Sequence, residues 1–211
     1  SYYHSSDLGF WNTITLNSLK GHNVKDNFEF KAMAGIYRHL INEPNEQLTL
    51  SPSVMLWHFD KNLSEYTYGH GGYYSPQKYI SSALTLAYKR RTEKWSYLVE
   101  GSGSFGYTKK KDTKRYYDVV FRNESYKKMF TEEDSLDDIV SGDSGPSWGY
   151  AFRGAAEYRV TSNLVLGSSV SVAHSSDYTP AIAGMYFRYY LFDYNGDLPM
   201  PPSPPVPYTQ W

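Results

Sequence analysis

The chain has no cysteine among its 211 residues. It therefore has no disulfide framework, no thiolate metal site and no cysteine nucleophile. The formal net charge is −1 at pH 7, so no basic field favours nucleic acid as a partner. Mean hydropathy is negative, and no apolar run approaches the roughly 20 residues that a transmembrane helix needs. Taken alone, these absences are typical of a soluble protein.

Aromatic residues, in contrast, are abundant, with 22 Tyr, 10 Phe and 5 Trp making 18% of the chain. A closed β-barrel also crosses a bilayer, and its average hydropathy stays low because only every second residue meets lipid. Such barrels carry aromatic residues at both membrane interfaces. The composition thus fits an outer-membrane barrel, and it also fits a soluble Tyr-rich β-sandwich or glycan-binding domain.

Alternation of apolar and polar residues predicts eight strands. They cover residues 8–19, 28–41, 47–59, 78–90, 94–107, 148–160, 163–174 and 180–192. Their connections alternate in length. Residues 42–46, 91–93 and 161–162 are tight, whereas 20–27, 60–77, 108–147 and 175–179 are mostly longer. Short turns on one rim and long loops on the other are typical of outer-membrane barrels, and this pattern predicts periplasmic termini.

The predicted strand 148–160 shows the alternation most clearly. One face carries Trp148, Tyr150, Phe152, Gly154, Ala156, Tyr158 and Val160, and the other carries Gly149, Ala151, Arg153, Ala155, Glu157 and Arg159. Aromatic residues at both ends of the first face fit a lipid-facing strand, with the charged residues in a hydrated lumen. A sandwich with one wet face explains each strand singly about as well, but it does not explain why the aromatics stand at the strand ends.

Several segments resemble a known family. They are INEPNEQLTL at 41–50, YTYGHGGYYSPQKYISSALTL at 66–86, GSGSFGY at 101–107, WGYAFRGAAEYRV at 148–160 and AGMYFRYYLFDY at 183–194. Together they are similar to the C-terminal domain of the bacterial cellulose synthase operon protein C family. The resemblance implies an outer-membrane channel for cellulose export, carried behind periplasmic tetratricopeptide repeats of the same precursor. It further implies cooperation with the inner-membrane cellulose synthase complex.

The resemblance also implies an antiparallel up-and-down transmembrane β-barrel of about sixteen strands, an even number as in other single-chain barrels. Eight strands are predicted here, or ten if residues 116–122 find a partner. Eight strands alone would enclose a lumen filled by side chains. We therefore expect the C-terminal half of a larger barrel, with residues 1–193 forming wall and loops. A small structural or adhesive barrel without a polymer-sized pore is the alternative.

Polymer transport requires a wide pore, aromatic faces and polar groups that exchange hydrogen bonds, with no bond chemistry. The predicted inward-facing candidates are Glu100, Arg153, Glu157, Arg159, Arg188 and Tyr190. For each charged residue the alternative role is an ion pair that links neighbouring strands. No HExxH motif is present, and the GxSxG match at residues 145–149 (GPSWG) runs into the predicted strand 148–160, where a nucleophile elbow needs a strand-to-helix turn; both observations disfavour an outer-membrane hydrolase. We predict no catalytic residue, no metal site and no cofactor.

Residues 66–77, the second part of connection 60–77, combine glycines with flat aromatic rings. Its candidate residues for contact with the polymer or for the external mouth are Tyr68, Gly69, His70, Gly71, Gly72, Tyr73, Tyr74, Ser75, Pro76 and Gln77. The alternative is a loop that packs on itself and braces the rim. We expect His70 to act through hydrogen bonds, because nothing near it has the spacing of metal ligands.

Two further segments have unusual composition. The connection 108–147 is basic in its first half and acidic in its second, which suggests gating of the mouth or contact with lipopolysaccharide phosphates, against a default of solvated charge. Residues 194–211 form a Pro-rich tail that cannot continue a strand. Such a tail either enters the barrel from the periplasmic side and narrows it, or remains stiff and exposed.

Overall fold

The structure is a computed structural model that describes residues 2–5, 7–117, 139–175 and 179–205. The regular secondary structure of these residues consists of strands, and nothing helical within them has the length and apolar character that a membrane span requires. The strands are β1 Tyr2–Ser5, β2 Leu8–Gly21, β3 Val24–Glu43, β4 Glu46–Phe59, β5 Lys78–Arg91, β6 Trp95–Lys109, β7 Thr113–Lys114, β8 Ile139–Val140, β9 Ser144–Arg159, β10 Leu164–His174 and β11 Ala181–Tyr189.

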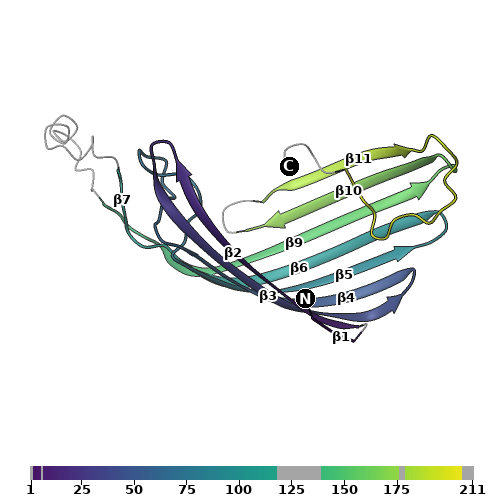
Figure 1. Cartoon of the computed structure of the whole chain (residues 1–211), viewed down its shortest axis with the longest axis horizontal. Coiled ribbons are helices and arrows are strands. Elements are labelled where there is room, and N and C mark those ends of the chain that lie inside the picture. Colours follow the sequence, from purple (N-terminus) through teal and green to yellow (C-terminus); the bar gives the residue numbers. More distant parts are fainter. Residues whose placement is uncertain (1, 6, 118–138, 176–178, 206–211) are drawn as a thin grey trace.

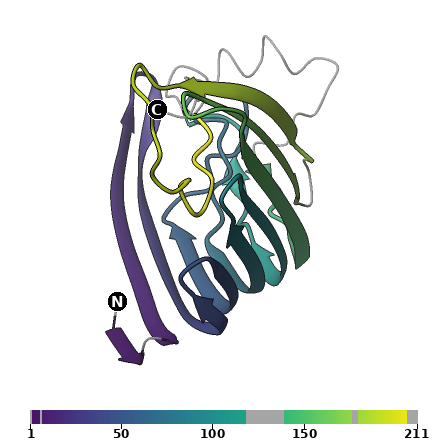
Figure 2. The same cartoon turned by 90° about the vertical axis from the view of Figure 1, so that its right-hand side faces the viewer.

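Nine of the strands form one antiparallel sheet in the order β1-β2-β3-β4-β5-β6-β9-β10-β11, and β7 pairs with β8. The sheet curves into a trough, which is clearest when it is viewed along the strands (Figures 1 and 2). The prediction of an all-β antiparallel fold is confirmed. The described residues do not close a barrel, because β1 and β11 stand at the two free edges of the sheet.

All eight predicted strands are present, as β2 to β6 and β9 to β11. The three tight connections are also confirmed, since β3 and β4, β5 and β6, and β9 and β10 follow one another after two to four residues. The short strand β1 was not predicted, because four residues are too few to display alternation. The last strand ends at Tyr189, where the chain turns away from the sheet.

The prediction of a longer connection over 20–27 is wrong. β2 continues to Gly21, which pairs with Val24, and the turn consists of His22 and Asn23. Asn23 has a φ of 59°, a left-handed conformation that asparagine tolerates and tight turns need. The hairpin is polar on both faces near its tip, so the sequence shows no apolar alternation there although the strand pairing continues.

The possible strand over 116–122 is not formed where the structure describes the segment. Tyr116 and Tyr117 lie outside any strand, and residues 118–122 fall outside the described ranges. The connection between β6 and β9 pairs instead at its base, where Thr113 and Lys114 face Val140 and Ile139.

Side chains alternate between the two faces of the sheet, and register partners share a face. We call the concave side the inner face and the convex side the outer face. Along β5 the inner face receives Ser81, Ala83, Thr85 and Ala87, whereas the outer face receives Ile80, Ser82, Leu84 and Leu86. The inner face is therefore built mainly from small and polar residues, while large apolar residues project from the outer face.

The tail after β11 returns across the concave side of the sheet (Figure 2). Leu198 in this tail is only 1% exposed, and the inner-face residues Leu98, Ala155 and Val165 are buried as well. Since the sheet is a single layer, these apolar groups are shielded from water by the tail. The main hydrophobic core of the molecule therefore lies between the sheet and the tail.

Candidate functional site on the inner face

The inner face has two ends. We call the end with the tight connections between β3 and β4, β5 and β6, and β9 and β10 the turn end. The loop end is the opposite one, where connection 60–77 joins β4 to β5. The tail begins at the turn end, because the last residue of β11, Tyr189, pairs with Leu164 at the start of β10. The predicted site residues divide between these two ends.

At the turn end the carboxylate of Glu157 is completely buried and fully partnered. The Tyr186 hydroxyl donates to it at 2.6 Å, and Arg188 forms an ion pair with it at 3.1 Å. The backbone N–H of Ser203, in the tail, donates to the same carboxylate at 3.2 Å. Tyr186 reaches this position because its ring lies flat on Gly167, where a Cβ atom would be 2.2 Å from the ring.

Three more side chains of the sheet bind the tail. Arg91 donates to the carbonyl of Leu198 at 3.1 Å and forms an ion pair with Asp197 at 3.2 Å. The Ser96 hydroxyl donates to the carbonyl of Pro199 at 2.5 Å, and Arg159 donates to the carbonyl of Gly196. Proline carbonyls and their neighbours have no strand partner in such a tail, so the sheet supplies the missing donors.

The predicted inward-facing residues all lie on the inner face, but in two groups. Glu157, Arg159, Arg188 and Tyr190 gather at the turn end, where Arg188 also donates to the Tyr190 hydroxyl and Tyr190 stacks on Tyr194. Glu100 and Arg153 are register partners on β6 and β9, further along the strands. The turn-end group thus links strands and holds the tail.

At the loop end, connection 60–77 is a compact loop with its own small core. Leu63, Ser75, Pro76 and Gln77 are buried, and the Leu63 N–H donates to the Ser75 hydroxyl at 2.8 Å. Gly69 and Gly72 adopt φ of 88° and 65°, which glycine allows without strain. Gly69 also forms a bridge with Val24, so the tip of the β2–β3 hairpin supports the loop.

This loop is tied to its neighbours by side-chain hydrogen bonds. His70 uses Nε2 to bond the Lys114 carbonyl at 2.7 Å, which confirms the hydrogen-bonding role predicted for it. Asn27 donates to the Tyr73 hydroxyl at 2.9 Å, and burial raises the pKa of Tyr73, so this phenol stays neutral. Most of the predicted loop residues therefore brace the rim.

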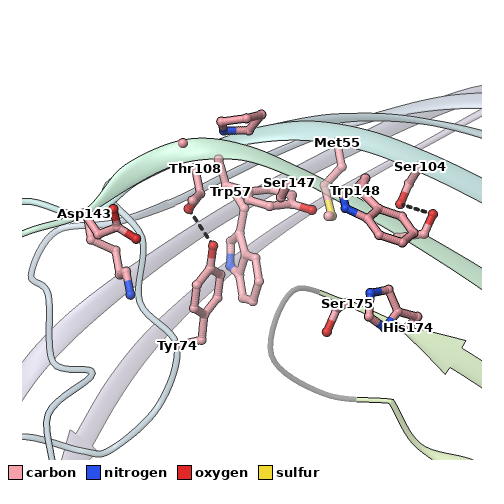
Figure 3. A pocket seen from close by; sticks show the side chains of 15 residues that line it. Met55, Trp57, Tyr74, Ser104, Thr108, Asp143, Ser147, Trp148, His174 and Ser175 are labelled. Carbon is pink, nitrogen blue, oxygen red and sulfur yellow. Dashed lines mark hydrogen bonds between the residues drawn. The ribbon is translucent and has the colours of Figure 1, made fainter.

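Tyr74 is the member of the loop that reaches the inner face. Its hydroxyl shares a hydrogen bond of 2.5 Å with the Thr108 hydroxyl, and 40% of its surface remains exposed. The centre of its ring lies 5.8 Å from that of Trp57 on β4 (Figure 3). It lies 6.5 Å from the ring centre of Tyr79 on β5. Three aromatic rings from two strands and a loop thus meet at the loop end.

Trp57 is held in place by charged neighbours on β3. Its indole N–H donates to Glu29 at 2.7 Å, and the Lys31 ammonium lies 5.0 Å from its ring centroid, within cation–π distance. Because polar partners hold the indole in position, the ring presents a fixed surface to the inner face.

The aromatic cluster borders an open cavity of about 550 Å³ (Figure 3). Other lining residues on the inner side include Met55, Ser104, Thr108, Lys110 and Asp143. Flat rings beside hydroxyl, ammonium and carboxylate groups suit a ligand with apolar ring faces and many hydroxyls, such as a sugar. Within the described ranges, no three His, Asp or Glu side chains gather as a metal site.

Trp57 and Tyr79 were not among the sequence-based candidates. The signal that identifies them is strand parity, since Val54 and Leu56 belong to the apolar outer face and Trp57 must then face inward. For Tyr79 the same reasoning applies relative to Ile80.

Comparison with known proteins gives consistent matches. The model of the family "Cellulose synthase operon protein C C-terminus" matches residues 1–192. Cellulose synthase operon protein C of Salmonella typhimurium is 37% identical over all 211 residues, and that of Escherichia coli K12 is 35% identical over the same span. The Pseudomonas fluorescens protein of the same name is 32% identical over 96% of the chain. The chain spans 18%, 18% and 15% of these relatives, respectively.

Proposed function

Since the chain belongs to the family of the C-terminal part of cellulose synthase operon protein C, we propose that it forms wall, mouth and tail of an outer-membrane channel through which cellulose leaves the cell. Membership in this family supports a role in cellulose biosynthesis. The channel itself is inferred from the two faces of the sheet, and the contrast between these faces is the observation that carries the proposal.

The outer face has the layout of a lipid-facing surface. Large apolar residues such as Leu84, Leu86 and Val170 are about half exposed along the middle of the strands. Aromatic residues follow at both ends on this face. They are Phe105, Tyr107, Trp148 and Tyr150 near the loop end, and Tyr88, Trp95, Tyr97 and Tyr158 near the turn end. Two aromatic belts that flank an apolar band are typical of outer-membrane barrels.

The two open edges of the sheet support a barrel wall that contains more strands than this sheet. β1 and β11 each leave backbone groups unpaired at an edge of the sheet, and lipid supplies no hydrogen-bond partner for such groups. We propose that further strands of the same polypeptide close the barrel, to about sixteen in all. The tight turns and both termini then face the periplasm, where tetratricopeptide repeats of the precursor and the inner-membrane synthase complex are the expected partners.

The inner face offers what a passing glucan needs. Trp57, Tyr74 and Tyr79 provide apolar ring faces at the loop end, and hydroxyl and charged groups lie beside them. Contacts of this kind exchange readily, so they guide a polymer without holding it. We propose a passive conduit that performs no bond chemistry, with cellulose as its cargo.

Bulky substitutions on neighbouring residues of β4 test this proposal. Ser53 lies on the inner face and Val54 on the outer face. In the full-length protein we expect Ser53→Trp to lower cellulose secretion several-fold, because the indole enters the lumen. Val54→Trp adds a larger side chain to the lipid side and leaves secretion near wild type. Equal secretion by the two variants, with both inserted in the outer membrane, would overturn the proposed channel.

A further inference from the structure

Two lysines face each other on the outer face at the loop end. Lys78 of β5 and Lys109 of β6 are register partners, and both are exposed. Register partners on one face have Cβ atoms about 5 Å apart, and like charges placed directly opposite destabilise a strand pair. Among the residues that the structure describes, no carboxylate forms an ion pair with either ammonium group.

The outer-face residues two positions along the strands from this pair are apolar or aromatic. Leu56, Ile80 and Tyr107 are register partners across β4, β5 and β6, and each is about half exposed. The two lysines therefore lie just beyond the edge of the apolar outer surface, next to Tyr107 at its border. Phosphate groups of lipids lie at this level of a membrane, directly outside the hydrocarbon.

The opposite end of the same face provides a contrast. There Arg90 of β5 is the register partner of Glu46 of β4, and the Tyr88 hydroxyl donates to Glu46 at 2.7 Å. The cation at the turn end thus has a carboxylate as its register partner, whereas each lysine at the loop end has another lysine. At the loop end Asp60 lies 3.5 Å from the His58 ring, so this carboxylate is paired with the histidine.

We propose that Lys78 and Lys109 form a binding site for the phosphate of a lipid headgroup in the outer leaflet. One phosphate between two ammonium groups would turn a repulsive pair into two charge-assisted hydrogen bonds. The acyl chains of the same lipid would lie on Leu56, Ile80 and Tyr107. This inference rests on the membrane placement within the proposed function, and it does not depend on the cargo.

The test uses the full-length protein in nanodiscs of phosphatidylethanolamine with a small fraction of lipid A carrying two phosphates. Lipid retained by the protein is measured by native mass spectrometry. We expect the wild type to enrich this lipid A and not the same lipid without phosphates. The double variant Lys78→Gln with Lys109→Gln should lose enrichment on the order of tenfold. Replacement of both lysines by arginine should retain it, because arginine also binds phosphate.

Lys94→Gln, in the tight connection between β5 and β6, is the matched control and should not change enrichment. Undiminished enrichment in the double glutamine variant, or equal enrichment of the lipid without phosphates, would overturn the site. The lipid measurement involves no cellulose, so a failure of the secretion test on Ser53→Trp and Val54→Trp would count against the channel and not against the lipid site.

Discussion

The two ends of the inner face differ in whether their polar and aromatic side chains are already bound by other parts of the protein. At the turn end, Arg91 and Ser96 bond carbonyls of the protein's own tail, and Glu157 accepts a hydrogen bond from the Ser203 N–H of the tail. Leu198 of the tail is buried. At the loop end, Tyr74 keeps 40% of its surface exposed beside an open cavity. The first region is a completed interface, whereas the second is a surface available to a ligand.

The tail also shows how a segment without regular structure becomes ordered. Proline restricts the backbone before folding, so less conformational entropy is lost when the tail docks. Burial of one leucine contributes roughly 2 kcal/mol, and each hydrogen bond to a charged group contributes on the order of 1.5–3 kcal/mol. Several such contacts along one short segment are enough to hold it on the sheet.

Glu157→Gln should have the largest effect on this contrast. The substitution leaves Arg188 without its carboxylate partner, and loss of one partner from a buried pair costs about 3 kcal/mol. The Ser203 N–H, which donates to this carboxylate, should then exchange with solvent roughly 100-fold faster. Hydrogen exchange of the tail measures the change.

Glu93→Gln, in an exposed connection, serves as the charge-matched control and should leave tail exchange unchanged. Unaltered protection of Ser203 in the Glu157 variant would mean that the carboxylate does not anchor the tail. The tail would then be held by Arg91, Ser96 and Arg159 together with the apolar contact of Leu198.

Leu198→Ala should have a smaller effect at the same end. Truncation of a buried leucine leaves a cavity and costs about 2–3 kcal/mol. We expect faster proteolysis of the tail in the folded protein. Leu191→Ala is the control, because Leu191 is 84% exposed and its truncation should change little. A tail equally resistant in both variants would contradict the assignment of Leu198 to the core.

Tyr74→Ala should weaken glucan binding by about 1 kcal/mol, because one aromatic stacking surface is lost at the loop end. Titration of the full-length protein with soluble cello-oligosaccharides, followed by tryptophan fluorescence, measures it. Tyr74→Phe keeps the ring and loses only the bond to Thr108, so its affinity should stay close to wild type. Tyr66→Ala, in the same loop but 92% exposed, should have no effect. Equal losses in the alanine and phenylalanine variants would assign the role to the hydroxyl.

The strands could be predicted from the sequence because period-2 alternation is local and strong. The same alternation assigns Trp57 and Tyr79 to the inner face, although the sequence-based candidates omitted both. Strands in polar segments were harder to predict. In the hairpin around His22 and Asn23 no apolar face exists, so continuous strand pairing looked like a loop.

The position of the tail could not be predicted in the same way. Its anchors are far away in sequence, with Arg91 bonded to Leu198 and Ser96 to Pro199, and a Pro-rich segment has no periodicity that identifies a partner. The role of loop 66–77 was equally ambiguous. The same glycines and tyrosines fit bracing and ligand contact, and only the contacts separate His70 and Ser75 from Tyr74.

The most direct test of the account concerns two adjacent serines on β10. Ser168 lies on the outer face as the partner of Ala156, and Ser169 lies on the inner face as the partner of Ala155. The chain has no cysteine of its own, so Ser168→Cys and Ser169→Cys each place a single thiol in this region. In outer membranes containing the full-length protein, each thiol is exposed to a charged, water-soluble maleimide. We expect rapid labelling at position 169 and protection by lipid at 168, as the assignment of the two faces requires. Equal labelling, or faster labelling at 168, would contradict it.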